Sequence, residues 1–420
     1  MSEKTRSDVS GFCIQITESF VDAEPFWRAL EQTGDAIVFQ TYDWQAAWHQ
    51  LIGRQQRVRP CIAIVTTDDD RPLMLLPLGI VRRGLGRALI WLGGELTDYN
   101  GPVLAADAAL YLNGLGIDGL WRRLRHELPA FDYVDFQRLP AEIGNQHNPF
   151  VQLSNRGNPI AGRCTRLGSS WETYHNGKRS AETRRKERKK EGKLGLHGPI
   201  EFVVAQTTAE IDRIVAALVA QKSASYQRKG VKNLFRDPAY VDFLKAFAHD
   251  HVESGLAVLA AVKVDDEIIA TQWGLIYGNR FYCLVYGHDQ GRFARYSPGN
   301  VLLRRLLEWC CERDIDVFDF TYGDESYKDH WCEDRLALHD CLLPSSPLGS
   351  VIVLGIRCSE GVRLTVKRSS HVHAFVTGIR KLWYQALAQP RPDARQRFGS
   401  EPREAARENE PNAEKEWNKA

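Results

Sequence analysis

The stretch "YSPGNVLLRRLLEWCCERDIDVFDFTYGDESYKDHW", residues 296–331, predicts a helix, a strand and a polar segment in that order. Ser297 stands where an N-cap is expected, and Pro298 suits the first helical position because its missing N–H needs no partner there. Gly299 lets another group approach the backbone closely. A first helical turn offers free N–H groups to anions, so this turn predicts an anion site, although an ordinary capped helix explains the same residues. The candidate site comprises Ser297, Pro298, Gly299, Asn300 and Arg295.

The pattern around this stretch occurs twice along the chain. Two strand-like runs surround an Asp-rich turn in "CIAIVTTDDDRPLMLLPLGIV" (61–81) and again in "AVLAAVKVDDEIIATQWGLIY" (257–277). A helical segment precedes each pair, and a helix followed by "DYVDF" (132–136) or "DVFDF" (316–320) closes each unit. This order predicts a duplicated α/β (α+β) module, with a mixed, mostly antiparallel sheet flanked by helices in each copy.

Composition shifts suggest where the units begin and end. A length of 420 residues is too great for one ordinary core. A segment rich in Gly, Ser and Asn separates the repeats, and a Pro- and Ser-containing break follows the second repeat. The predicted division is residues 1–165, residues 166–345, a C-terminal extension 346–388 and a charged tail 389–420, which we expect to be disordered.

The net charge, the apolar runs and the cysteine content argue against several classes of protein. The formal net charge of +2 demands no nucleic acid or membrane partner. The N-terminus has no apolar core of a signal peptide, and no apolar run reaches the length of a membrane helix. Nine Cys without paired CxxC spacing read as reduced thiols of a cytoplasmic protein. His371 and His373 lack further ligands at metal spacing, so no metal site is predicted.

Two other glycine-rich stretches are poor candidates for phosphate binding. "GLGIDG" (114–119) has the letters of a dinucleotide fingerprint but lacks the buried strand before it, and it is interpreted as a loop that starts a helix. "RRGLGRALI" (82–90) is interpreted as part of a β-hairpin.

Taken together, "YSPGN", the amphipathic helix after it and "DVFDFTYGDESYKDHW" resemble the GNAT-type acetyltransferase domain of CelD-type proteins. That family is grouped with cellulose and exopolysaccharide biosynthesis and is related to FemAB-like transferases. "FQTYDWQAAW" and "TDYNGPVL" in the first half resemble the family's N-terminal region, so the resemblance spans roughly residues 12–340. It implies tandem GNAT-like (FemAB-like) domains and acyl transfer from acetyl-CoA or another acyl-CoA to an amine or hydroxyl acceptor.

The resemblance also directs attention to the polar segment after the second repeat's last strand. Acyl transfer requires a base, a group that stabilises the oxyanion and an acid for the leaving thiolate. Asp324 and Glu325 are candidates for the base or for anchoring the acceptor, Tyr327 for the acid, and Lys328 for the oxyanion. A surface ion pair explains Asp324 and Lys328 as well. Candidate substrate-binding aromatic residues are Trp273, Tyr286 and Tyr322.

A basic run, "KRSAETRRKERKKEGK" (178–193), opens the second half. It is interpreted as a solvated helix, or as a contact for CoA phosphates, for an acidic polymer or lipid head group, or for RNA. FemAB-like relatives use aminoacyl-tRNA, so a tRNA-dependent transferase is the alternative enzyme. A non-catalytic partner of the polysaccharide-synthesis machinery, or an RNA-binding adaptor, is the alternative from another class.

Overall fold

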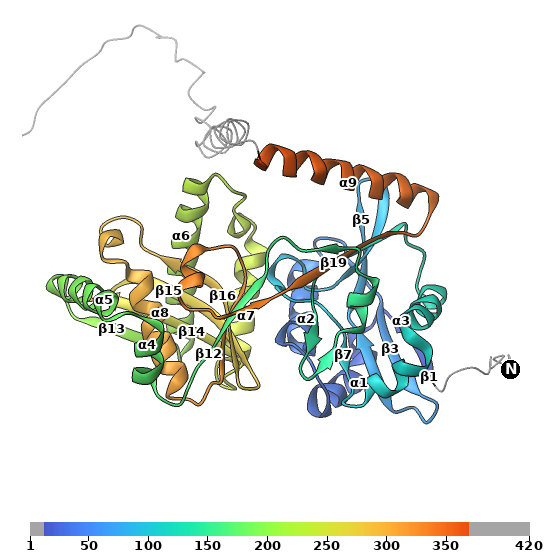
Figure 1. Cartoon of the computed structure of the whole chain (residues 1–420), viewed down its shortest axis with the longest axis horizontal. Coiled ribbons are helices and arrows are strands. Elements are labelled where there is room, and N and C mark those ends of the chain that lie inside the picture. Colours follow the sequence, from blue (N-terminus) through green and yellow to red (C-terminus); the bar gives the residue numbers. More distant parts are fainter. Residues whose placement is uncertain (1–11, 369–420) are drawn as a thin grey trace, which may run out of the picture.

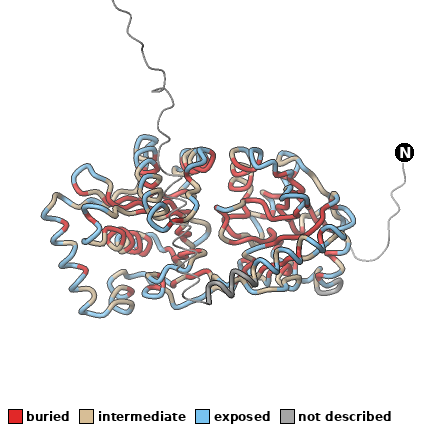
Figure 2. The backbone as a smooth tube through the Cα atoms, turned by 90° about the horizontal axis from the view of Figure 1, so that it is seen from above, coloured by how far each residue is buried: buried red, intermediate tan, exposed pale blue. Residues whose placement is uncertain are grey.

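The computed structural model describes residues 12–368, which form two α/β halves side by side (Figure 1). Figure 2 shows buried segments running through the middle of both halves, with exposed segments outside. Within the described range, no helix has the length and apolar character needed to cross a membrane. The predicted tail 389–420, the end of the extension 346–388 and the His371–His373 pair lie outside the described residues.

The first half contains two sheets, in the orders β1-β3-β4-β7 and β11-β19-β8-β6-β5-β2, and a small two-stranded ribbon. The predicted hairpin is confirmed: its turn places Asp70 at φ 62°, a left-handed conformation that Asp tolerates. The elements are β1 (Phe12–Thr17), α1 (Phe20–Thr33), α2 (Tyr42–Trp48), β2 (Arg59–Pro60), β3 (Ile62–Thr67), β4 (Pro72–Leu76), β5 (Leu78–Arg83), β6 (Gly86–Trp91), β7 (Val103–Leu104), α3 (Ala108–Glu127), β8 (Tyr133–Pro140), β9 (Glu142–Ile143), β10 (Gln146–His147) and β11 (Arg156–Gly157).

The second half is one seven-stranded sheet in the order β13-β14-β15-β16-β17-β12-β18. Its predicted hairpin is also confirmed, with Asp265 at φ 52° in the turn. The elements are β12 (Gly162–Arg166), α4 (Trp171–Lys178), α5 (Ala181–Leu194), β13 (Ile200–Val204), α6 (Thr208–Lys229), α7 (Pro238–His251), β14 (Ala257–Val264), β15 (Glu267–Tyr277), β16 (Arg280–His288), α8 (Pro298–Cys311), β17 (Val317–Tyr322), β18 (Asp334–Leu336), β19 (Leu338–Pro344) and α9 (Pro347–Arg368).

The two glycine-rich stretches have different outcomes. Residues 82–90 lie in the β5–β6 hairpin, as predicted, with Gly84 at φ 61° in its turn. Helix α3 already begins at Ala108, before residues 114–119. Gly116, with non-helical φ 70° and ψ 165°, divides it into two helical segments, so the interpretation as a loop that starts a helix is confirmed only for the second segment.

Both halves repeat one strand arrangement. In each, a parallel pair is joined through a helix: β6 with β8 through α3, and β16 with β17 through α8. "DYVDF" and "DVFDF" supply the second strand of each parallel pair, with Val134 opposite Leu89 and Phe318 opposite Phe281. Both sheets are therefore mixed and mostly antiparallel, as predicted.

The halves exchange strands. β12 lies at the end of the first half in sequence but pairs with β17, and β19 lies at the end of the second half but pairs with β8 (Figure 1). A division near residues 165 and 345 remains our proposal, with β12 and β19 each belonging to the opposite sheet. The helix α9 then packs against β19 and β8 of the first half.

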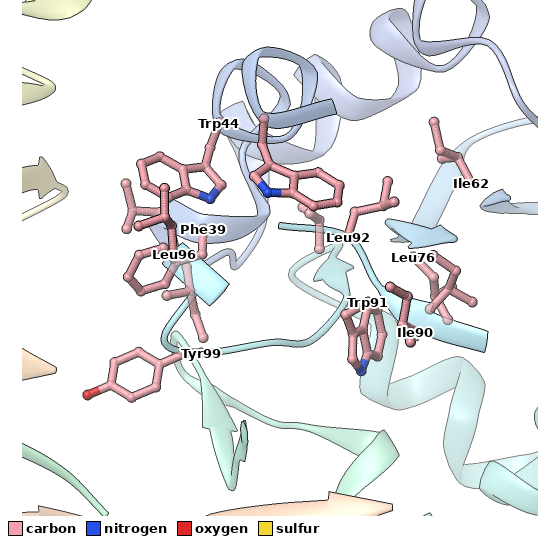
Figure 3. Close-up of a cluster of buried hydrophobic side chains, with 14 of the residues drawn as sticks. Phe39, Trp44, Ile62, Leu76, Ile90, Trp91, Leu92, Leu96 and Tyr99 are labelled. Atoms are coloured by element: carbon pink, nitrogen blue, oxygen red, sulfur yellow. The ribbon is translucent and has the colours of Figure 1, made fainter. Parts of the chain in front are cut away.

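An aromatic cluster fills the space between the halves. The ring of Trp44 on α2 lies 4.9 Å from that of Phe243 and 5.2 Å from that of Phe247, both on α7. The ring centroids of Phe39 and of Tyr282 on β16 lie 5.7 Å apart. Figure 3 shows Trp44, Phe39 and Tyr99 together at one edge of the first half's apolar cluster, with the Tyr99 hydroxyl pointing out of it. Burial of these rings holds the halves together.

A buried polar contact lies beside this cluster. Asp319 on β17 accepts hydrogen bonds from the Tyr99 hydroxyl at 2.9 Å, from Arg280 at 3.0 Å and from the Thr321 amide at 2.8 Å. Burial raises the pKa of Asp319, and these donors oppose the effect. The carboxylate of the second half thus depends on a hydroxyl of the first.

We expect Tyr99→Phe to lower the free energy of unfolding by about 1.5–3 kcal/mol, because a charged, buried acceptor loses one donor. Urea denaturation measures this change. Tyr111→Phe is the control: the Tyr111 hydroxyl contacts Arg71 at the surface, and its loss should cost less than about 0.5 kcal/mol. Equal losses in the two variants would contradict the role of the Tyr99–Asp319 contact.

Candidate active site

In the second sheet, the parallel strands β16 and β17 diverge. The two strands pair only over Arg280–Tyr282 and Val317–Asp319, and beyond that point they separate. A cavity of about 420 Å³ opens between the separated ends. Its walls come from the ends of β16 and β17, the start of α8, one side of α6 and the segment after β17. Residues 296–331 therefore supply two walls of one cavity.

The first turn of α8 lies at this cavity, but Ser297 does not cap it as predicted. Ser297 has left-handed backbone angles, φ 58° and ψ 57°, and its side chain makes no capping hydrogen bond. Its hydroxyl accepts instead from Lys190 at 2.9 Å. Gly299 lies against the Tyr286 hydroxyl so closely that a Cβ there would be 1.6 Å from the hydroxyl oxygen. Glycine is required by this contact.

The basic run forms the predicted helix, α5, but only its outer face is solvated. Glu187 is buried and accepts from Arg179 at 2.8 Å and from Asn300 of α8 at 3.1 Å. Burial opposes ionisation of Glu187, but hydrogen bonds from His175, Arg179 and Asn300 outweigh it and lower its pKa to about 2. The exposed basic residues of α5 are Arg185, Lys186, Arg188, Lys189, Lys190 and Lys193. The helix thus brings positive charge to the start of α8.

The segment after β17 places a buried ammonium group in the cavity. Lys328 is 4% exposed, and its Nζ lies 3.1 Å from a Glu325 carboxylate oxygen and 3.5 Å from the Thr321 carbonyl oxygen. Burial disfavours the charged form of Glu325, but Lys328 outweighs it and the pKa of Glu325 is lowered. Lys222 on α6 also lines the cavity, and burial lowers its pKa. With Lys229 and Arg179, the lining is rich in positive charge.

Four further side chains line the cavity in their neutral forms. Burial raises the pKa of Tyr327 and of Tyr286 well above the usual tyrosine value, so both hydroxyls keep their protons at neutral pH. Burial also raises the pKa of Cys283 to about 12, which leaves a thiol rather than a nucleophilic thiolate. Burial, with Arg228 and Lys222 nearby, lowers the pKa of His288. Neutral imidazole is therefore the form present at pH 7.

The predicted site residues divide into two groups. Asp324 and Arg295 are exposed and do not line the cavity, and Pro298 is buried beneath the turn. Trp273 is fully buried in the contact between the halves, where its indole N–H donates to the Leu244 carbonyl at 3.2 Å, so the prediction that it binds substrate is wrong. Those that line the cavity are Ser297, Gly299, Asn300, Tyr286, Tyr322, Glu325, Tyr327 and Lys328.

Sequence reasoning missed three residues at or beside the cavity. Lys222 and His288 line it, yet the first lies in helix α6 and the second ends strand β16, both outside any sequence motif. Asp98, in the "TDYN" segment of the first half, lies 3.6 Å from Arg138. Burial raises the pKa of Asp98 to about 6, opposed by Arg138, Thr321 and Lys328. The polar segment "TDYN" (97–100), which follows Gly93 and Gly94, was the sequence feature that could have pointed to Asp98.

Comparison with known proteins agrees with this geometry. Residues 179–329 match the family model described as acetyltransferase (GNAT) domain. The crystal structure of FemX superposes with a TM-score of 0.54 and 11% identity, over 81% of this chain and 99% of FemX. This likeness shows the fold, and the predicted tandem GNAT-like architecture is confirmed. A search of the curated proteins by sequence gives no match.

Two other solved structures align over most of their length. A tandem GNAT protein from the clavulanic acid biosynthesis pathway has a TM-score of 0.45 and 13% identity, over 80% of this chain and 99% of its own. The structure of L-PGS from Bacillus licheniformis has a TM-score of 0.45 and 12% identity. The alignment covers 84% of this chain and 98% of the L-PGS chain.

The family match covers the cavity, the start of α8 and the segment up to Asp329. Residues 179–329 are thus similar to a GNAT acetyltransferase domain, and this match supports an acyltransferase.

Proposed function

We propose that the protein transfers an acyl group from an acyl-CoA to an amine or hydroxyl acceptor in the cavity between β16 and β17. The observation that carries this proposal is the meeting of the α8 first turn, the diverging strands and a buried lysine around one cavity of about 420 Å³. Diverging strand ends leave unpaired backbone groups that an extended pantetheine arm can bind. The helix start and Lys222, Lys229 and Lys190 favour the phosphates.

In the proposed reaction, the acceptor nitrogen or oxygen forms a bond to the acyl carbon while the carbon–sulfur bond breaks. The acceptor's proton passes to a base, and the thiolate takes a proton from an acid. Lys328 stabilises the oxyanion, because a buried ammonium group needs no reorganisation when negative charge develops beside it. Tyr327 is the acid, since it lines the same cavity as Lys328 and carries a hydroxyl proton.

For the base, we propose His288 or Glu325. Asp98, which lies beside the cavity, is a third candidate. His288 is neutral at pH 7 and lines the cavity. Glu325 is ionised but paired with Lys328, which suits anchoring an amine acceptor better than removing its proton. Asp324, exposed and outside the lining, has no role in this proposal. A role in cellulose or exopolysaccharide biosynthesis rests on the CelD-type resemblance of residues 296–331 alone.

A second candidate is transfer from an aminoacyl-tRNA. The observation that favours it is the exposed cationic face of α5 beside Ser297, which offers more positive charge than CoA phosphates need. The FemX-like fold is compatible with this donor.

We expect wild-type protein to bind CoA and acetyl-CoA in calorimetry, and Gly299→Ala to bind at least roughly tenfold more weakly. The added Cβ would overlap the Tyr286 hydroxyl, so the helix start or the ring must shift. Gly192→Ala is the matched control, because a Cβ there meets no atom within 4 Å. Unchanged binding in Gly299→Ala would move the donor elsewhere, and no binding by wild type would overturn the acyl-CoA proposal.

Lys328→Met should lower kcat roughly 10²–10³-fold, the usual effect of losing one oxyanion donor, with little change in KM for acetyl-CoA. Thiol release reports the rate. Lys245→Met serves as the comparison, since Lys245 pairs with Asp212 at the surface. A kcat equal to wild type in Lys328→Met would exclude the lysine from the chemical step.

A double charge reversal on α5, Arg188→Glu with Lys189→Glu, distinguishes an acyl-CoA donor from an aminoacyl-tRNA donor. With an acyl-CoA donor, we expect turnover of acetyl-CoA to fall less than roughly threefold, because both side chains lie outside the cavity lining. With a tRNA donor, affinity for aminoacyl-tRNA would fall and its salt dependence would become shallower. Filter binding across salt concentrations distinguishes these outcomes.

A further inference from the structure

The last described helix, α9, carries apolar side chains on two opposite faces. One face packs on the first half, where Val353 is 4% exposed and both Ile352 and Ile356 contact the apolar core. Gly349 lies so close to the Asp132 backbone that a Cβ would be 1.7 Å from the carbonyl oxygen. Positions 349, 352, 353 and 356 follow the spacing of one helical face. This face accounts for the docking of α9 but not for the apolar residues opposite to it.

The opposite face of α9 is both apolar and exposed. Leu348 is 41% exposed, Val351 70% and Leu354 64%. Steps of three residues place these side chains on one stripe of the helix, and Gly355 and Cys358, both exposed, continue it. A helix on a protein surface ordinarily turns polar residues outward, so an apolar outer stripe indicates an interaction surface.

The turn of the β5–β6 hairpin adds a further exposed apolar side chain beside α9. Gly86 lies against the helix, because a Cβ there would be 2.3 Å from the Ile352 side chain. Leu85, the preceding residue, is 80% exposed. Figure 1 shows α9 along the outside of the first half, next to the end of β5. Four of the eight exposed large hydrophobic side chains in the described chain thus gather here, and we call them the α9 patch: Leu85, Leu348, Val351 and Leu354.

The charges around the α9 patch are positive. Arg82 in the hairpin and Arg357 on α9 are exposed, and each donates to a backbone carbonyl, of Gly84 and of Leu342. Arg125 is exposed beside the start of α9, where it donates to the Ser345 hydroxyl at 2.9 Å. Within residues 12–368, none of these three guanidinium groups forms an ion pair with a carboxylate. The acidic residue of α9, Glu360, is already paired with Arg156 at 2.6 Å.

The sequence that follows the patch has the same character. Residues 361–392 contain no Asp or Glu, and their aromatic residues are Phe375, Trp383 and Tyr384. Basic side chains are attracted to anionic lipid head groups, and Trp and Tyr favour the boundary between head groups and acyl chains. The basic residues of this segment are Arg363, Lys367, Arg368, Arg380, Lys381 and Arg391.

Charge complementarity distinguishes the partners that could cover the α9 patch. A second copy docked through the same surface would bring its own unpaired arginines against Arg82, Arg125 and Arg357, and like charges at an interface repel. Residues 369–392, which follow α9 directly, have no carboxylate to neutralise them either. An anionic lipid surface neutralises these cations and also receives the apolar side chains.

We propose that the α9 patch binds the surface of a membrane that contains anionic lipids. In this arrangement α9 lies in the plane of the interface, with Leu348, Val351 and Leu354 in the acyl boundary and the arginines at the phosphates. The proposal does not depend on the proposed acyl transfer, because it uses no residue of the cavity between β16 and β17.

Sedimentation of the full-length protein with vesicles tests this binding. The vesicles are phosphatidylcholine alone, or phosphatidylcholine mixed with phosphatidylglycerol. We expect binding to the mixed vesicles that weakens as salt rises, and a loss of about tenfold in Val351→Asp, because a carboxylate that anionic lipid repels replaces an inserted apolar side chain. Val21→Asp is the matched control, since Val21 on α1 is 74% exposed and lies outside the patch, and its binding should change less than about twofold.

A second variant separates the α9 patch from the basic helix α5. The double reversal Arg188→Glu with Lys189→Glu should retain most of the binding, and a loss there without a loss in Val351→Asp would assign the lipid contact to α5 and overturn the proposal. Absence of binding to the mixed vesicles would also overturn it, as would equal losses in Val21→Asp and Val351→Asp. A dimer in light scattering that Val351→Asp dissociates, without vesicle binding, would replace the membrane by a second copy of the chain.

Discussion

The buried carboxylate of Asp319 is the contact on which the rest of this molecule depends. It stands on β17 at the last residue that pairs with β16, and it holds Arg280 of that strand and Tyr99 of the other half. A buried carboxylate without donors would be very costly, so the two halves must meet here for β17 to be stable in this position. The divergence of the strands, and with it the donor cavity, begins one residue later. The geometry of the active site is therefore fixed partly by a hydroxyl outside its own sheet.

The two halves share one strand arrangement, but different side chains surround the diverging strand ends in each half. Past the parallel pair, each closing strand has a bulge with a residue at a left-handed φ of 57°, Thr321 in the second half and Arg138 in the first. The cavity of the second half contains a buried lysine and the start of an uninterrupted helix, α8. In the first half, helix α3 is interrupted at Gly116, and in the cavity of about 320 Å³ beyond β6 and β8 the cations Arg83 and Lys232 are paired with Asp135 and Glu95. Duplication of a fold thus leaves the chemistry to the residues at the diverging ends.

Much of the fold was predictable because it rests on local patterns. The Asp-containing hairpins, the helices α7 and α8 and the closing strands follow from periodicity and turn chemistry. The kinked course of α3 through "GLGIDG" was not, since Gly usually ends or starts helices. The exchange of β12 and β19 was beyond reach, because strand partners far apart in sequence leave no local mark. For the site, the 296–331 stretch predicted Lys328 and Gly299, which line the cavity, whereas Trp273 was misjudged because an indole that stacks and an indole that packs have the same sequence pattern. Lys222, His288 and Asp98 depend on tertiary approach alone.

The strand exchange has a consequence for how the chain matures on the ribosome. The sheet of the first half needs β19, which lies between β11 and β8 and ends at Pro344. Nearly the whole described chain must emerge before that sheet can close, so the first half cannot complete its fold as an independent N-terminal unit. Until then, the side of β8 that β19 will cover offers open backbone groups to other chains. Such a topology, with many contacts between distant segments, favours slow folding and creates a need for protection during synthesis.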